Sequence, residues 1–371
     1  MRVVHIFWAL GYGGIETMLV NIANEQARQG AEVCIVIIND MIAEELQRKI
    51  SREVELVRIG RTRGSKSLAF SKRLNQELDR LCPDVIHLHY SSIYNYLSRR
   101  WRRNMSCSVC STLHAMPHGT CGMAWLPGRM IQNLLFGQGG NVVNLNRIGK
   151  VFAISHSVAD ALKSDFGVDS TVVCNGIHTD MFKRREWVKP DEVFEIVQVS
   201  RLVHEKKGQD LLIEAVAKLA EQNYNLHVSF IGDGDSREYL ESLAEELGVQ
   251  SYISFLGTKP QDYLKDHLCE YDLFVQPSRY EGFGLTVAEA MAACVPVLVS
   301  SNQGPAEVTE NDKYGWVFEN GNVDDLTNQL RFLVENYGQC LDKVQPAREH
   351  VTREYDVSVT AKRYLEAYKK V

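Results

Sequence analysis

The chain has 371 residues, of which 45% are hydrophobic and 24% are charged, a composition typical of a globular protein with room for two domains. Its formal net charge of −6 argues against general nucleic-acid binding, and no apolar run is long enough to span a bilayer. Nine cysteines at irregular spacing indicate reduced thiols rather than a disulfide framework, so we expect a cytoplasmic protein.

Short Val- and Ile-rich runs alternate with helical stretches along the first half of the chain. We interpret the first run, residues 3–8, as a strand rather than a signal sequence, because no small-residue cleavage site follows it. A Gly-rich turn and a helix near 15–29 come next. Further strands are predicted at residues 33–38, 54–59, 84–89, 108–114, 150–155 and 171–174.

The same cycle restarts in the second half, after a polar stretch at 181–193, and predicts strands at 194–200, 226–232, 252–257, 273–278 and 295–300. Apolar strands alternating with helices indicate parallel sheets covered on both faces. We therefore predict an α/β protein of two doubly wound, Rossmann-like domains that face each other across a cleft. The domains are 1–183, on which a C-terminal helix (about 353–371) packs, and 184–352.

Two glutamates stand out in the apolar segment SRYEGFGLTVAEAMAACVPVLVS, residues 278–300. Glu281 follows a predicted strand, and the glycines on either side of Phe283 allow the backbone to turn tightly beside a ligand. The amides that begin the next helix suit a phosphate. Glu289 lies inside that helix and could accept hydrogen bonds from ribose, as Glu281 could from a sugar. The alternative is a capping or surface role for Glu281 and a solvent-facing Glu289.

A basic cluster follows the first strand of the second half, in SRLVHEKKGQDLL (200–212). It places Arg201 just past the strand and Lys206 and Lys207 in the following turn. Two fixed cations can clamp a diphosphate and stabilise it as a leaving group. A solvated charged loop is the alternative, and the pair of glutamates later in the chain favours the functional interpretation.

Three further motifs are weaker. The loop ALGYGGIET (9–17) precedes a helix and could approach a phosphate, but it lacks the G-x-G-x-x-G spacing and is equally compatible with a plain turn. His89 and His114 end predicted strands and would open onto the cleft, with a structural role as the alternative. A series of cysteines and histidines has spacing similar to that of a zinc site but lacks a second C-x-x-C, so we predict no metal. The series comprises Cys107, Cys110, His114, His118 and Cys121.

In the first domain, the candidates for contact with an acceptor or with a membrane are the basic segment SRRWRRNM and the apolar segment MAWLPGRMIQNLLF (123–136). Together they could meet an anionic surface or a lipid-linked molecule, and we keep peripheral contact at the inner face of the cell membrane open. The alternative is a charged helix end beside a buried packing segment. The basic segment contributes Arg99, Arg100, Trp101, Arg102 and Arg103.

Four motifs taken together, EGFGLTVAEAMAACVPVL, SRLVHEKKGQDLL, GDGDSREYL and CNGIHTDMF, resemble those of the family-4 retaining glycosyltransferases with the GT-B fold. The resemblance implies transfer of a sugar from a nucleoside-diphosphate sugar, with a UDP-sugar favoured, to a hydroxyl of a glycan or lipid-linked glycan in cell-surface polysaccharide assembly. It implies no cofactor and no metal, since protein cations perform the task that magnesium often does. By the same resemblance, we expect the acceptor to bind the first domain and the nucleotide-sugar donor to bind the second.

The resemblance also assigns roles to individual residues. Catalytic roles fall to Arg201, Lys206, Glu281 and His114. Donor-binding roles fall to Gly13, Gly14, Lys207, Gly282, Phe283, Gly284, Leu285 and Glu289. Counting back from the following glycine selects Lys207 for the diphosphate in place of Lys206, so that assignment stays open. The chain departs from the family pattern at His114-Ala115, where His-Asp is common, and at 175–178, where Asn-Gly-Val-Asp is common.

Three other functions occur on architectures of this kind. A sugar-nucleotide epimerase would need acid and base carboxylates at the donor sugar, for which Glu281 alone is thin support. A catalytically silent partner that binds a nucleotide sugar is disfavoured by the complete set of Arg, Lys and two Glu. An NAD dehydrogenase is disfavoured by the missing dinucleotide fingerprint. The base, the sugar, the acceptor and the oligomeric state stay open.

Overall fold

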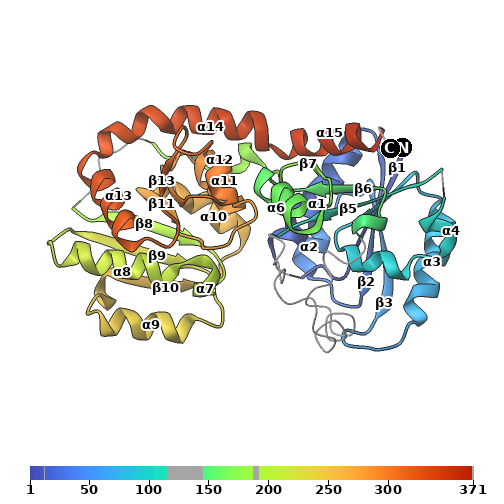
Figure 1. Ribbon diagram of the computed structural model, residues 1–371, viewed down its shortest axis with the longest axis horizontal. Helices are drawn as coiled ribbons and strands as arrows, with labels where there is room; N and C mark the ends of the chain where they lie inside the picture. Colours follow the sequence, from blue (N-terminus) through green and yellow to red (C-terminus); the bar gives the residue numbers. More distant parts are fainter. Residues whose placement is uncertain (12, 105, 116–144, 187–191, 370–371) are drawn as a thin grey trace. The chain divides into compact units, whose positions relative to one another are not determined.

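The computed structural model describes residues 1–371 except 12, 105, 116–144, 187–191 and 370–371 (Figure 1). The chain forms two compact units: Met1–Gly176 together with Val357–Val371, and Ile177–Asp356. The apolar segment 123–136, His118 and Cys121 lie outside the described residues.

The first unit is built on a seven-stranded sheet in the order β3-β2-β1-β4-β5-β6-β7, in which all neighbouring strands are parallel. The central strands are buried on both faces, which explains why their sequences are apolar runs rather than alternating patterns. The strands are β1 (Arg2–Phe7), β2 (Glu32–Asn39), β3 (Val54–Arg61), β4 (Val85–Leu88), β5 (Ser108–Leu113), β6 (Lys150–Ala153) and β7 (Thr171–Val172).

Helices cover both faces of this sheet. The last helix of the chain belongs to this unit and packs against α1, as the red and blue ribbons in Figure 1 show. The helices are α1 (Gly14–Arg28), α2 (Glu44–Lys49), α3 (Ala69–Leu81), α4 (Arg99–Arg102), α6 (His156–Phe166) and α15 (Val357–Tyr368), with 3-10 turns η1 (Ser91–Tyr96) and η2 (Leu145–Arg147).

The second unit has a six-stranded parallel sheet in the order β10-β9-β8-β11-β12-β13. Its strands are β8 (Phe194–Val199), β9 (Leu226–Ile231), β10 (Ile253–Gly257), β11 (Leu273–Gln276), β12 (Val297–Ser300) and β13 (Trp316–Phe318). Its helices are α7 (His204–Lys207), α8 (Gln209–Ala220), α9 (Arg237–Glu246), α10 (Gln261–His267), α11 (Leu285–Ala292), α12 (Gly304–Val308), α13 (Val323–Glu335) and α14 (Leu341–Tyr355), with 3-10 turns η3 (Thr179–Met181), η4 (Gln250–Tyr252), η5 (Leu268–Glu270) and η6 (Tyr337–Cys340).

Each sheet has one point at which the strand order reverses. In the first unit β1 lies between β2 and β4, and in the second β8 lies between β9 and β11. Open parallel sheets bind ligands beyond the carboxyl ends of the strands at such a point. The loops that follow β1, β4, β8 and β11 are therefore the places to look for functional side chains.

The predicted α/β class with two doubly wound parallel sheets is confirmed, and every strand expected from the sequence is present. The short edge strand β13 was not predicted. The chain passes between the units at 176–177 and 356–357, whereas domain limits at 183 and 352 were expected. The charged stretch at 181–186 is part of the second unit, because Arg185, whose side chain is 10% exposed, forms an ion pair with the buried Asp272 there.

Two global properties bear on function. No helix among the described residues is long and apolar enough to cross a membrane. Eight cysteines lie within the described part of the chain, and all of them are free thiols.

Candidate functional site

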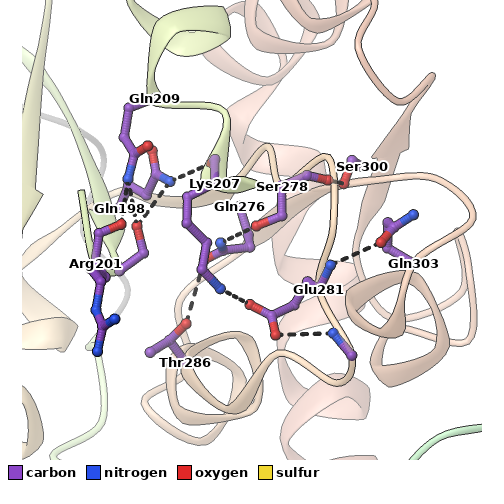
Figure 2. Close-up of polar contacts among 12 residues, drawn as sticks. Gln198, Arg201, Lys207, Gln209, Gln276, Ser278, Glu281, Thr286, Ser300 and Gln303 are labelled. Carbon is purple, nitrogen blue, oxygen red and sulfur yellow. Dashed lines mark hydrogen bonds and ion pairs between the residues drawn. The ribbon is translucent and has the colours of Figure 1, made fainter. Parts of the chain in front are cut away.

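Two loops meet at the carboxyl edge of the second sheet, next to the reversal point. The loop after β8 carries Arg201 and Lys207, and the loop after β11 carries Glu281. The ammonium group of Lys207 forms an ion pair with the Glu281 carboxylate (Figure 2). The two side chains are 23% and 22% exposed, so the pair is reachable from solvent. The structure thus brings together a lysine and a glutamate that are 74 positions apart in the sequence.

The two neighbouring lysines differ in their surroundings. Both lysines lie on the short helix α7, in which neighbouring side chains point about 100° apart around the helix axis. Lys207 points to Glu281, whereas Lys206 is exposed and its carbonyl oxygen accepts a hydrogen bond from the Tyr280 amide at 3.1 Å. Arg201 is also exposed, and its guanidinium group takes part in none of the contacts drawn in Figure 2. Of the two lysines, Lys207 is the one that shares a site with Glu281.

Gly208 explains how Lys207 comes to face β11. Its φ of +66° lies in the left-handed region, and a Cβ atom there would lie 2.0 Å from the carbonyl oxygen of Pro277. The Lys207 carbonyl accepts a hydrogen bond at 2.9 Å from the side chain of Gln198, which is buried. The turn after β8 therefore lies directly against the end of β11, and only glycine allows this approach.

The loop that carries Glu281 is held by residues that the sequence analysis did not single out. The Glu281 amide donates to the Gln303 side chain at 2.9 Å, and the Gly304 amide donates to the Glu281 carbonyl at 3.0 Å. A Cβ atom on Gly304 would lie 2.5 Å from the backbone of Gly282 and Phe283. The available signal was the dipeptide Gly304-Pro305 shortly after a strand, which marks a turn.

Helix α11 begins directly after this loop. Its N-cap residue, Gly284, has a φ of +97° and no side chain that could cap the helix, so the amides of the first two helical residues, beginning with Leu285, can face an anion. Gly282 precedes it in the turn. Phe283 is buried and packs edge-on against Tyr355, with ring centroids 5.3 Å apart. Phe283 therefore anchors the loop through its side chain.

Glu289 is not solvent-facing. It lies in α11, is only 8% exposed, and accepts a hydrogen bond at 2.7 Å from Gln261 on α10. Burial raises the pKa of Glu289 to about 7, although Gln261 and Lys265 favour the ionised form. A buried carboxyl group with a raised pKa is one of the signals by which functional sites are recognised.

The first unit has its own hollow at the carboxyl edge of its sheet. It has a volume of about 40 Å³ and is lined by Ile15 on α1, by Tyr90 after β4 and by His114 after β5, among others. Helix α1 starts at Gly14, and its N-cap Gly13 makes no side-chain capping hydrogen bond. Gly13, Gly14 and His114 thus belong to one edge of the first sheet, at its reversal point.

The expectation that His89 opens outward is wrong, because His89 is only 2% exposed. Its Nε2 lies 3.0 Å from Nδ1 of His5, and its Nδ1 lies 3.0 Å from Nε2 of His114. His114 as a whole residue is partly exposed, but its Nδ1 is enclosed and has no hydrogen-bond partner in the described part of the chain. Burial lowers the pKa of His114 to about 3, so its ring is neutral at neutral pH.

Three histidines form the one metal-like cluster found among the described residues. Ring nitrogens of His5, His87 and His89 lie within 4.8 Å of one another. Every ring nitrogen of the three already has a hydrogen-bond partner; for His87 these are Tyr368 at 2.6 Å and Thr112 at 2.7 Å. A metal ion would have to break these bonds in a dry interior, so the cluster fits a hydrogen-bond network better than a metal centre.

The arginine-rich segment forms the short helix α4 and its C-terminal flank. Trp101 is buried, with 3% exposure, and is therefore a core residue rather than a surface contact. The arginines are exposed; Arg100 lies over the Trp101 ring and pairs with Asp79 at 3.1 Å. The segment can therefore attract a negatively charged partner through its arginines, but its tryptophan is not available to contact that partner.

Comparisons with known proteins agree with this architecture. Residues 12–181 match the family described as Glycosyltransferase Family 4, and residues 180–350 match Glycosyl transferases group 1. An uncharacterized glycosyltransferase of Methanocaldococcus jannaschii is 29% identical over 302 residues, which cover 77% of this chain and 75% of that protein. A GDP-mannose-dependent alpha-(1-6)-phosphatidylinositol monomannoside mannosyltransferase of Mycobacterium tuberculosis is 30% identical over 195 residues, or 48% of this chain and 50% of that protein.

Solved structures share the whole fold. The structure of HepE from Anabaena in complex with UDP and glucose superposes with a TM-score of 0.77 at 19% identity, and the match covers 100% of both chains. The two family matches together extend over both units, from residue 12 to residue 350. The chain therefore belongs to the glycosyltransferases of the GT-B fold, with a Glycosyltransferase Family 4 unit followed by a Glycosyl transferases group 1 unit.

Proposed function

We propose that this enzyme transfers a sugar from a nucleoside-diphosphate sugar to a hydroxyl group of a glycan or lipid-linked glycan, with retention of configuration, in the assembly of cell-surface polysaccharide or glycolipid. The observation that carries the proposal is the Lys207–Glu281 ion pair beside the uncapped start of α11. A cation, a carboxylate and free helix amides at one edge suit a ligand that contains both a diphosphate and hydroxyl groups.

The ion pair can exchange partners at low cost. Each side chain is partly exposed, and such pairs contribute at most about 1 kcal/mol to stability. A donor would offer its diphosphate to Lys207 and its sugar hydroxyls to Glu281. Both charges then keep a partner throughout binding, so neither is left unpaired when the ligand excludes water.

The same arrangement supports a route for the reaction. As the bond between sugar and phosphate loosens, negative charge develops on the departing diphosphate, where Lys207, Arg201 and the α11 amides would stabilise it. The acceptor hydroxyl attacks from the face that the phosphate leaves, and its proton passes to the departing phosphate. In this route Glu281 binds hydroxyls and is not the nucleophile, and the protein cations take the place of a metal ion.

Glu289 and the relatives narrow the donor class. A carboxylate in the first turns of α11 is suited to ribose hydroxyls, in keeping with a nucleotide whose phosphates lie at the helix start. HepE binds UDP and glucose, and the mycobacterial relative is dependent on GDP-mannose. We favour a UDP-sugar, with a GDP-sugar as the alternative that the same experiment separates.

The test is incubation with a panel of UDP-, GDP- and ADP-sugars, with release of the free nucleoside diphosphate as the readout. We expect release from one donor class, and at least a hundredfold loss in kcat/KM for Lys207→Ala, since one charged contact to the departing phosphate contributes about 3 kcal/mol. Lys206→Ala is the matched control and should change kcat/KM less than threefold. An isomerised sugar nucleotide, or equal effects of the two variants, would contradict the proposal.

A peripheral membrane contact through the exposed arginines of the α4 segment is a separate part of the proposal. Arg99, Arg102 and Arg103 are exposed and carry no apolar anchor, so binding would be electrostatic and sensitive to salt. Reversing these charges to glutamate should abolish sedimentation with anionic vesicles at low salt and leave donor hydrolysis intact. Unchanged sedimentation would remove the membrane from the proposal.

A further inference from the structure

A hydrogen-bonded chain of three histidines crosses the first sheet and ends at the hollow beside α1. His5 lies on β1, His89 directly follows β4 and His114 directly follows β5. Because these strands are parallel and adjacent, their side chains line up on one face, and the rings connect nitrogen to nitrogen at 3.0 Å in both steps. At its inner end, His5 Nε2 lies 2.8 Å from Oε1 of Gln26 on α1.

Such a chain has a direction. Burial keeps the rings neutral, and a neutral imidazole has one N–H donor and one acceptor nitrogen. If His5 donates from Nε2 to the Gln26 oxygen, its Nδ1 must accept from His89. By the same rule the Nδ1 of His89 accepts from the Nε2–H of His114. The tautomer of His114 is then set by an amide group that lies two rings away.

The orientation of Gln26 sets this direction. The oxygen of its amide, and not the NH₂ group, lies 2.8 Å from His5 Nε2, so His5 donates there. In this orientation the Gln26 NH₂ group has no hydrogen-bond partner in the described part of the chain. The reverse direction would require the amide to turn over and would move the unpaired buried N–H to Nδ1 of His114.

We propose that Gln26, His5 and His89 are positioning residues that hold His114 as its Nε2–H tautomer, so that the unpaired lone pair of Nδ1 accepts a hydrogen bond from a substrate hydroxyl at the hollow lined by Ile15, Tyr90 and Ser91. The substrate part of this statement rests on the proposed function, and the tautomer part does not. A volume of about 40 Å³ has room for a small polar group such as a hydroxyl.

The experiment is nitrogen NMR of the full chain labelled with ¹⁵N-histidine and without ligand, with His114→Gln to assign the His114 signals. We expect an unprotonated, pyridine-like Nδ1 and a protonated Nε2 for His114 at pH 7. A protonated Nδ1 in the wild-type protein would overturn the proposal, whatever reaction the enzyme catalyses.

Variants at the far end of the chain separate positioning from simple packing. Gln26→Leu removes the terminal acceptor and should shift His114 toward the Nδ1–H tautomer, whereas Gln26→Glu restores an acceptor oxygen and should keep the wild-type pattern. Thr112→Val removes a hydrogen bond to the neighbouring His87 and is the control; it should lower stability without changing the His114 signals. An unchanged His114 spectrum in Gln26→Leu would also overturn the proposal.

Activity supplies a second readout. With the nucleotide sugar that the wild type hydrolyses fastest, Gln26→Leu should lower kcat/KM roughly fivefold, the equivalent of one neutral hydrogen bond, and Gln26→Glu should recover most of the loss. If no donor is hydrolysed, the proposed function fails while the NMR result stands. If donors are hydrolysed and Gln26→Leu changes neither readout, the histidine chain has no positioning role.

Discussion

Replacement of Glu289 by glutamine should make the protein more stable at alkaline pH. The wild-type carboxyl is buried and its pKa is raised from 4.5 to about 7, a displacement that corresponds to about 3 kcal/mol at about 1.4 kcal/mol per pH unit. The glutamine can still accept the hydrogen bond from Gln261, but it buries an NH₂ group where the wild type has an oxygen, at a cost of about 1 kcal/mol. The net gain above pH 7 is therefore about 2 kcal/mol.

The pH dependence gives this prediction its sign. Below about pH 4.5 the Glu289 carboxyl is protonated in both the folded and the unfolded state, so the burial penalty is absent and Glu289→Gln should be slightly less stable than the wild type. Between pH 4.5 and about 7 only the unfolded state ionises, so the stability of the wild type falls as the pH rises. Above about pH 7 the full penalty is present.

Thermal unfolding at pH 5 and pH 8, followed by circular dichroism, measures this difference. At pH 8 the melting temperature of Glu289→Gln should exceed that of the wild type by roughly 4–8 °C, and at pH 5 it should not. Glu246→Gln, at an exposed position of α9, is the matched control and should behave as the wild type at both values. A difference between Glu289→Gln and the wild type that is the same at both pH values would refute the assignment of a raised pKa to Glu289.

Two further substitutions test the packing of the second unit. Gly208→Ala should lower the free energy of unfolding by more than about 3 kcal/mol, because its Cβ would lie 2.0 Å from a carbonyl oxygen. Gly248→Ala is the control, since Gly248 also has a positive φ, +70°, but has open space around it, and this variant should lose only about 1 kcal/mol. Urea denaturation compares the two variants, and equal losses would contradict the steric argument. Arg185→Leu should cost about 3–5 kcal/mol by the same measurement, since it leaves the buried Asp272 without its cation, and a loss below about 1 kcal/mol would show that Asp272 is solvated or protonated.

Strand positions could be predicted because each parallel strand is buried on both faces and so reads as a continuous apolar run. The run at 194–200, for example, is β8 to within one residue. The same logic fails for β13, since three residues at the edge of a sheet are too short to form a run. It also fails at the crossing between the units, because the polar composition of 181–186 does not reveal that Arg185 pairs with the buried Asp272.

The individual roles of the site residues depend on geometry that spacing does not contain. The sequence places Lys206 and Lys207 side by side, and only the left-handed turn at Gly208 decides which of them faces Glu281. The histidine chain was hidden for a related reason. His5 and His89 are far apart in the sequence and meet through the parallel pairing of β1 with β4, which no local pattern reports.

The charged pair and the backbone around it have different tasks. Lys207 and Glu281 contribute little to stability, because both are partly exposed. Their loops are held instead by two glycine contacts, Gly208 against Pro277 and Gly304 against the backbone that follows Glu281, where no side chain fits. Because the two loops are fixed by their backbones, Lys207 and Glu281 can each exchange the other for a ligand group while the loops stay in place. A ligand can therefore open the ion pair without disturbing the backbone that aims the two groups, which is the pre-organisation that electrostatic catalysis needs.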